Sequence, residues 1–285
     1  MEKIVKKAKN TGKKSWIYRF FFMPKFYLAR LFYATLFIGI INAIIVYFYY
    51  NSWLYEKFTI PETMHSVIGV VIGLVLVFRT NTAYDRWWSG RKNIETMLSS
   101  FRFFSAKLDV NVQDTEIKKQ ILNDIKYYLS TYLMYLKSKS QKVLVRRRNE
   151  YMKSIFKKLA NLEKEGKLNN RQVSMLETAL YDVVKAATSC ETIKSTPIPM
   201  SLAMHAKTCI LIYVLSLPFG LFHDLGYYST PIIMLIFFMM AGIEIISNEI
   251  EDPFHGDPND LPVEQLLNEV FDNVLVNMKT DEKFL

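Results

Sequence analysis

Cysteine and histidine are scarce in this chain, and that scarcity narrows what the protein can be. Its 285 residues include 2 cysteines and 4 histidines. Cys190 and Cys209 do not make a disulfide framework in a chain of this length, so nothing indicates an oxidising compartment. The histidines are scattered along the sequence at positions 65, 205, 223 and 255.

Short motifs that carry catalytic chemistry are also missing. The sequence contains no glycine loop of the kind that cradles phosphates, no HExxH pair, no CxxC pair and no nucleophile elbow. We therefore expect that the protein is not an enzyme and that it uses no cofactor.

Hydrophobic residues are abundant and are separated from the charged ones along the chain. They make up 51% of the sequence, with 20 Phe and 17 Tyr, while charged residues still make up 22%. The apolar residues gather in four segments, at 31–50, 58–78, 208–222 and 227–246. The first has 20 residues, which at ~1.5 Å per residue cross the ~30 Å core of a bilayer. The third is short and is interrupted by Pro218. The pattern predicts an all-α integral membrane protein with four transmembrane helices.

The basic residues indicate how these segments are oriented. Most Lys and Arg lie in 1–30 and 79–207, whereas the connections at 51–60 and 223–226 carry only Lys57. Loops rich in Lys and Arg stay on the cytoplasmic side, so both termini and the middle region are predicted to be cytoplasmic in a cell (inner) membrane. The first segment has no small-residue cleavage pattern after it, which favours a retained helix over a signal peptide. The net charge of +9 is explained by this topology, without a nucleic-acid partner.

Five regions follow from this pattern. They are a basic cytoplasmic segment (1–30), membrane helices one and two (31–78), a cytoplasmic helical region (79–205), membrane helices three and four (206–247) and a cytoplasmic C-terminal segment (248–285). Within the middle region, apolar residues recur at helical spacing in 116–137, 151–163 and 173–190, and Gly166 is a plausible helix stop.

The second apolar segment has two distinct faces. Gly69 and Gly73 are four residues apart, the spacing that allows close helix contact in lipid. At about 100° per residue, Thr63, Val67 and Val71 point away from these glycines. If the glycine face packs on other helices, the opposite face meets either the axis of a ring or lipid. An apolar ring at a constriction can gate ions by dewetting.

Two ionisable residues lie near the predicted outer end of this helix. Glu62 and His65 are candidates for charges at the mouth of a pore, because ionisable groups in membrane segments are often functional. Each has a simpler alternative. Thr59 and Glu62, with Pro61 between them, match a capping box, and His65 can hydrogen-bond a neighbouring helix.

The next residues, 78–92, read FRTNTAYDRWWSGRK and closely resemble the signature of bacterial and organellar bestrophin-like proteins. Two more stretches are similar to that family: Cys190-Glu191 followed by TPIP at 196–199, and EDPF at 251–254 followed by DPNDLP at 257–262. The resemblance covers nearly the whole chain. It implies an all-helical pentamer around a single axial pore, with a narrow neck formed by the second membrane helix.

The resemblance also implies positions within that pore. It places the neck at Thr63, Val67 and Val71, and a slip of one residue would place it at Met64, Ile68 and Ile72. Gly166-Lys167-Leu168 is similar to the tripeptide that narrows the family's cytoplasmic exit, which makes Leu168 an aperture candidate. The alternative is a helix–turn–helix corner in which Leu168 packs inward.

An acidic run after the last membrane segment is a weaker feature. Asp257 and Asp260 fall where animal members of the family bind calcium, but calcium wants six or more oxygen ligands, and this run is thinner. A helix cap or a turn is the simpler role, and no metal is expected.

The sequence thus predicts a passive channel for small monovalent ions, with chloride favoured by the family resemblance. A sodium-type monovalent-cation channel of the same fold is the first alternative. A structural or regulatory membrane protein and a secondary transporter are others, although no internal repeat of the transporter kind is present. The expected partners are further copies of the chain, membrane lipid and the permeant ions.

Overall fold

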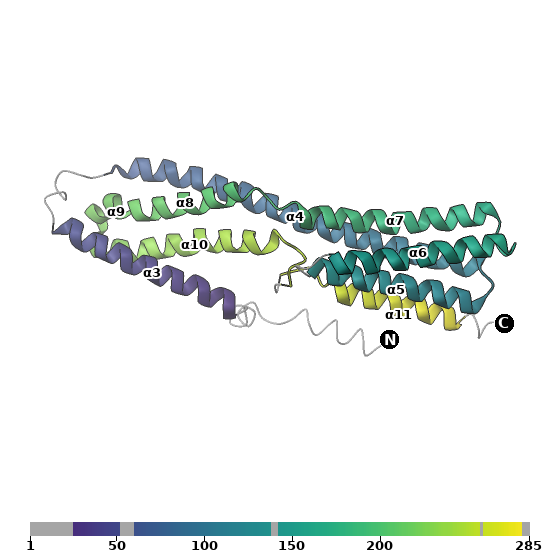
Figure 1. Cartoon of the computed structure of the whole chain (residues 1–285). Helices are drawn as coiled ribbons and strands as arrows, with labels where there is room; N and C mark the ends of the chain where they lie inside the picture. Colours follow the sequence, from purple (N-terminus) through teal and green to yellow (C-terminus); the bar gives the residue numbers. More distant parts are fainter. Residues whose placement is uncertain (1–24, 52–59, 138–141, 257–258, 281–285) are drawn as a thin grey trace. The chain divides into compact units, whose positions relative to one another are not determined.

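The computed structural model describes residues 25–51, 60–137, 142–256 and 259–280, and these contain helices and no strand (Figure 1). The elements are α3 (Lys25–Tyr50), α4 (Glu62–Asn111), α5 (Thr115–Lys137), α6 (Lys142–Lys164), α7 (Asn170–Ser195), α8 (Met200–Ser216), α9 (Pro218–Leu225), the 3-10 turn η2 (Gly226–Tyr228), α10 (Ser229–Ile250) and α11 (Val263–Thr280). The all-α fold class predicted from the sequence is confirmed.

The chain divides into two compact units. The first, which we call the apolar unit, comprises Met1–Thr80 and Pro199–Ser247. The second, the bundle unit, comprises Asn81–Ile198 and Asn248–Leu285. Helix α4 contributes its beginning to the apolar unit and its remainder to the bundle unit.

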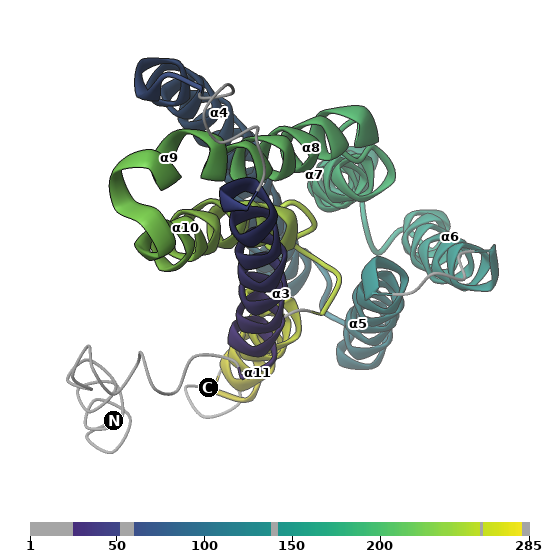
Figure 2. The same ribbon diagram turned by 90° about the vertical axis from the view of Figure 1, so that its left-hand side faces the viewer.

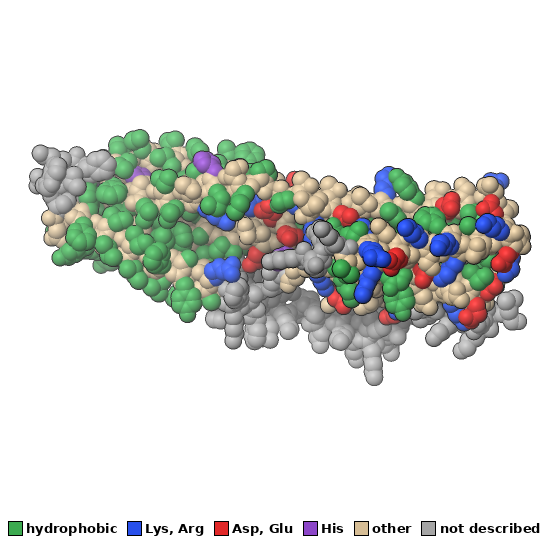
Figure 3. All heavy atoms as spheres, in the orientation of Figure 1, with side chains coloured by type: hydrophobic (Ala, Val, Ile, Leu, Met, Phe, Trp, Pro, Cys, Tyr) green, Lys and Arg blue, Asp and Glu red, His purple; other side chains and the backbone are tan. Residues whose placement is uncertain are grey.

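Hydrophobic side chains make up both the interior and the surface of the apolar unit. Its interior is one cluster of apolar side chains: Ile38, Ile72, Leu76, Ile210, Tyr213, Val214, Leu217 and Ile233. In Figure 3 the surface over α3, α8 and α10 is also almost entirely hydrophobic, whereas acidic and basic side chains are spread over α5, α6 and α7. An apolar surface of this extent on helices is suited to lipid contact.

Three stretches of the described chain are long and apolar enough to cross a membrane: Ala29–Tyr50, Glu62–Asn111 and Met200–Ile250. The last stretch holds two long helices, α8 and α10, which α9 and η2 connect, as Figure 2 shows end-on. The third apolar segment expected at 208–222 thus corresponds to α8 and α9, with Pro218 as the first residue of α9. The number of membrane crossings stays a prediction.

Two polar side chains of α3 donate hydrogen bonds to carbonyls of the same helix. Thr35 Oγ1 donates to the carbonyl of Leu31 at 2.8 Å, and Asn42 Nδ2 donates to the carbonyl of Ile38 at 2.9 Å. Such bonds lower the cost of placing a polar side chain among apolar ones. Farther along, α3 meets α10 closely, because a methyl group on Gly39 would stand 2.5 Å from the sulfur of Met234.

The bundle unit is a set of amphipathic helices around its own core. Helices α5 and α6 pack side by side (Figure 1), and the core includes Phe101, Tyr132 and Leu159. Helix α7 begins with a capping box in which Asn169 and Gln172 exchange hydrogen bonds between side chain and backbone. The helices predicted at 116–137, 151–163 and 173–190 are confirmed as α5, part of α6 and part of α7. The chain leaves α6 through Gly166, whose φ of 70° suits glycine.

Candidate functional site

Helix α4 presents one packed face and one exposed face within the apolar unit. On the packed face, a methyl group on Gly69 would stand 2.7 Å from the Tyr213 hydroxyl, so only glycine allows this approach. On the opposite face Thr63, Val67 and Val71 are exposed, Val67 to 65%. The glycine pattern therefore predicted correctly which side of the helix packs at Gly69. Gly73 differs, because no described atom lies within 4 Å of the place a methyl group there would occupy.

The two registers proposed for the neck have different surroundings in the structure. Met64 and Ile68 are exposed, but Ile72 is only 7% exposed and packs in the apolar core. A ring of Met64, Ile68 and Ile72 would need Ile72 to leave that core. The packing therefore favours Thr63, Val67 and Val71 as the set that shares one open face.

Near the N-terminal end of α4, His65 contacts α8. Its side chain is 5% exposed, and Nε2 lies 3.1 Å from the carbonyl oxygen of Ser216 on α8. His65 thus makes the hydrogen bond to a neighbouring helix that was the simpler of the two roles considered for it. A cavity of about 200 Å³ adjoins this contact, and its lining includes Glu62, Ser66, Tyr213 and Gly220.

Glu62 is the first residue of α4 and is exposed. The side chain of Asp224 on α9 lies within hydrogen-bonding reach of its carboxyl group. Thr59, the other member of the expected capping box, lies outside the residues that the structure describes. The N-terminal end of α4 therefore carries two neighbouring acidic side chains.

The part of α4 that ends the apolar unit, around Arg79 and Thr80, contains buried charge. Arg79 Nε lies 3.8 Å from Glu244 Oε2 on α10, and both side chains are buried. Lys207 of α8, which is about half exposed, places Nζ 3.9 Å from the other oxygen of Glu244. A hydrogen bond of 2.9 Å between the hydroxyls of Thr80 and Ser247 lies beside this group. Three helices are thus tied together around the Glu244 carboxylate.

The signature segment 78–92 lies within α4, and two of its side chains donate hydrogen bonds to backbone carbonyls of the bundle unit. The Arg86 guanidinium donates to the carbonyls of Ile193, Thr196 and Glu251 at 2.6, 2.7 and 3.0 Å. Trp87 Nε1 donates to the carbonyl of Asn259 at 3.1 Å. A cation at the end of α7 also suits the negative end of the helix dipole. Arg86 and Trp87 therefore have a structural role, because they join α4 to the backbone of other segments of the bundle unit.

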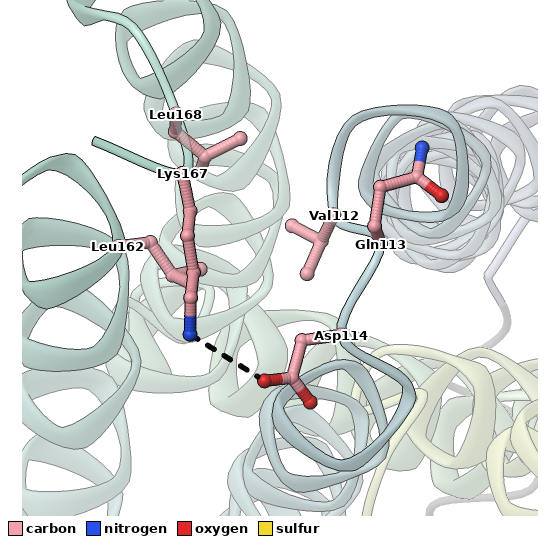
Figure 4. Close-up of a pocket in the computed structure, with 6 residues that line it drawn as sticks. All are labelled: Val112, Gln113, Asp114, Leu162, Lys167 and Leu168. Atoms are coloured by element: carbon pink, nitrogen blue, oxygen red, sulfur yellow. Dashed lines mark ion pairs between the residues drawn. The ribbon is translucent and has the colours of Figure 1, made fainter. Parts of the chain in front are cut away.

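Leu168 lies at the corner between α6 and α7 and is 3% exposed (Figure 4). It packs with the core of the bundle unit and borders a cavity of about 520 Å³, together with Val112 and Leu162. Within one protomer, Leu168 therefore packs inward at a helix–turn–helix corner, which was the alternative to an aperture. An aperture formed by several copies of the chain stays a prediction.

The polar residues that line this cavity are Gln113, Asp114 and Lys167. Lys167 carries its positive charge. Its Nζ lies 2.8 Å from Glu165 and 3.7 Å from Asp114, toward which Figure 4 shows it pointing. The hydrogen bond and charge of Glu165, with a smaller contribution from Asp114, raise the pKa of the Lys167 ammonium. Lys167 therefore remains protonated at this corner of the bundle unit.

Of the two weak calcium candidates, only Asp260 lies in the described residues. Asp257 lies outside them, and Asp260 accepts a hydrogen bond from the backbone N–H of Gly256, which closes a turn. No group of three or more His, Cys, Asp or Glu side chains able to hold a metal occurs in the described part of the chain. The turn was the simpler role expected for Asp260.

Sequence reasoning missed the partners of several of these residues. Arg79, Lys207 and Glu244 come from three separate segments, so the sequence alone does not show that they meet. The acceptors of Arg86 are backbone carbonyls, which every residue has, so no sequence pattern marks them. Helical spacing could have placed Arg79 on the packed face of α4, since it lies fourteen residues, close to four helical turns, after His65.

Comparison with known proteins gives consistent results at the levels of sequence and fold. The family model described as "Bacterial/Fungal Bestrophin protein" matches residues 8–276. A voltage-dependent anion channel-forming protein of Synechocystis is 33% identical over 244 residues, which cover 76% of this chain and 77% of that protein. A protein of the same description from Nostoc is 31% identical over 227 residues, covering 72% and 74%.

Among solved structures, a bacterial bestrophin homolog from Klebsiella pneumoniae superposes with a TM-score of 0.78. It is 20% identical in sequence, and the match covers 86% of this chain and 97% of that one. At this identity the likeness concerns the fold alone.

Proposed function

Since the chain belongs to the bacterial and fungal bestrophin family, we propose that it forms a channel for small monovalent anions, with chloride as the main permeant ion. The names of the Synechocystis and Nostoc relatives support an anion-conducting function. The channel is a homo-oligomer, a pentamer in this proposal, in a cell (inner) membrane with both termini cytoplasmic. It catalyses no reaction.

One observation carries the proposal for the pore. Helix α4 packs through Gly69 and Ile72 and leaves Thr63, Val67 and Val71 on an open face. In a ring of five copies this face lines the axis, and two valines per subunit form an apolar neck. Such a neck passes ions when wet and blocks them when it dewets. Leu168 provides a second constriction if the corner that carries it opens toward the axis.

The test is a measurement of reversal potential with purified protein in a planar bilayer under a gradient of potassium chloride. A reversal potential near the chloride equilibrium value supports the anion channel. A value near the potassium equilibrium potential supports a channel but contradicts anion selectivity. No current from protein shown to be oligomeric favours the structural, regulatory or transporter alternatives.

A cation channel is the second candidate, and the acidic outer end of α4 favours it. An exposed Glu62 with Asp224 beside it, repeated around a ring, gives a negative field at the mouth. The N-terminal end of α4 has the opposite effect, because its unpaired N–H groups attract anions. We expect Glu62→Gln to shift the reversal potential toward the chloride value by several millivolts. An unchanged reversal potential would exclude Glu62 from setting selectivity.

A further inference from the structure

The break between α8 and α9 leaves the backbone carbonyl of Ser216 without its helical donor. Pro218 has no N–H, and the chain around it departs from regular α-helix. In an unbroken helix the N–H of Gly220 would bond to the carbonyl of Ser216. Here that N–H bonds to the carbonyl of Leu217 at 3.1 Å. The carbonyl of Ser216 therefore needs a donor from elsewhere.

His65 supplies that donor from α4. Its Nε2 lies 3.1 Å from the Ser216 carbonyl oxygen and 3.3 Å from the Ser216 hydroxyl. The hydroxyl donates its own proton to the carbonyl of Tyr213 at 2.7 Å. Because neither nearby Ser216 oxygen has a proton left to give, Nε2 carries the imidazole proton and donates it.

The other side of the imidazole ring lies against Gly220. A methyl group on Gly220 would stand 2.7 Å from Nδ1 and 2.9 Å from Cε1 of His65. Nδ1 is buried and has no hydrogen-bond partner among the described residues. The ring is thus held on one edge by a hydrogen bond and on the other by a contact that only glycine permits.

We propose that His65 is a positioning residue that anchors the outer end of α4 to the break between α8 and α9. This inference rests on the proposed channel function. His65 lies on the packed face, two residues from both Thr63 and Val67, so it does not touch the permeant ion. It acts by fixing the place of those two side chains in the neck, and the residues that face it are Tyr213, Ser216 and Gly220, with Glu62 one turn away.

Single-channel recording of three variants tests the role in conduction. We expect His65→Leu to lower the open probability about fivefold or more, because a lost hydrogen bond between helices has roughly this effect on an equilibrium, and to leave the reversal potential unchanged. His65→Gln places an amide N–H near the position of Nε2 and should recover most of the loss. The matched control is His205→Leu, the same substitution at an exposed histidine of α8.

A double-mutant cycle tests whether Gly220 belongs to the same contact. Gly220→Ala should also lower the open probability, because its methyl group displaces the ring. In the His65→Leu background the same change should cost less than in wild type, because the ring is gone and only the contact of the methyl group with the backbone oxygen of Ile60, at 3.2 Å, remains. Additive effects would contradict the proposed contact.

Amide hydrogen exchange of residues 66–72, measured by mass spectrometry on the detergent-solubilised protein, tests the anchor without any current. We expect at least fivefold faster exchange in His65→Leu and rates close to wild type in His65→Gln and His205→Leu. Equal exchange in His65→Leu and His205→Leu would overturn the anchor. Faster exchange with unchanged open probability would overturn its role in conduction. A wild-type protein without current would contradict the channel function. The exchange rates would still show whether His65 anchors α4.

Discussion

Val67 and Ile68 are consecutive residues of α4 whose side chains point about 100° apart, and both are exposed in the protomer. This pair distinguishes the two registers of the neck. In the favoured register we expect Val67→Ala to raise single-channel conductance about twofold or more, because a smaller side chain widens an apolar constriction and lets water in. Ile68→Ala, the matched control, should change it little. The reverse result would place Ile68 in the neck.

The bundle unit contains buried groups that resist losing a proton. Burial raises the pKa of the Cys190 thiol to about 12 and that of the Tyr128 hydroxyl to about 12. The folded protein therefore holds these protons more tightly than the unfolded chain, in which the thiol loses its proton near pH 9. The stability they contribute is complete below pH 9 and is lost as the pH rises toward 12.

For Cys190 alone, the expected loss between pH 9 and pH 10 is about 1 kcal/mol in the free energy of unfolding. Denaturant titrations of the detergent-solubilised protein at the two pH values measure it. In Cys190→Ala this part of the alkaline loss should disappear, while the tyrosines keep the loss above pH 10. A variant that loses as much stability as wild type between pH 9 and pH 10 would contradict the assignment.

Among the helices of the apolar unit, the Glu244 carboxylate is the point where α4, α8 and α10 meet. Removing one partner of a buried ion pair leaves the other charge buried and unpaired, which costs ~3–5 kcal/mol. We expect a loss of this size in Glu244→Ala, measured by unfolding in detergent. Lys207→Ala should cost less than about 1 kcal/mol, because Lys207 is about half exposed.

The combined substitution of Arg79→Met and Glu244→Leu separates charge from packing. An apolar pair of similar volume often replaces a buried ion pair without loss. The double variant should therefore be more stable than Glu244→Ala. A double variant as unstable as Glu244→Ala would mean that the pair is needed for more than neutralising charge.

The extent of each element followed from the sequence where hydrophobic spacing decided it. Ile121, Ile125 and Tyr132 of α5 were predicted to share a face, and all three are buried. Helix α8 begins at Met200, eight residues before the apolar run at 208, because hydropathy marks lipid contact and not where a helix starts. Gly73 shows a further limit of prediction from sequence. The glycine spacing indicates which face of the helix packs, but not which atoms contact each glycine.

At the scale of the whole molecule, the separation of apolar and charged residues along the sequence predicted one apolar surface and one charged surface. The apolar unit has the first and the bundle unit has the second. The family was predictable because the segment at 78–92 is long and specific. The contacts of Arg86 were not, because its acceptors are carbonyls of residues 193, 196 and 251, and any residue supplies a carbonyl. The hydrogen bond of His65 was not predictable for the same reason, because its acceptor is also a backbone carbonyl.

The proposed ring makes a prediction about mass. Five copies of a 33.4 kDa chain give a single assembly, because the open face of α4 needs neighbours to enclose a pore. Native mass spectrometry after release from detergent should give five times the mass of one chain. A predominant monomer or dimer would contradict the axial pore, whatever the family relationship.

The close approach of α3 and α10 makes one methionine sensitive to oxidation. The sulfur of Met234 lies against Gly39, where there is no room for an added methyl group. Peroxide converts a thioether to a sulfoxide, which is larger, polar and a strong hydrogen-bond acceptor. Gly39 has no side chain that could donate a hydrogen bond to the sulfoxide, so the modified Met234 side chain would have to move away from this contact. Oxidation of Met234 would therefore act at the contact between α3 and α10, and a methionine sulfoxide reductase would reverse it.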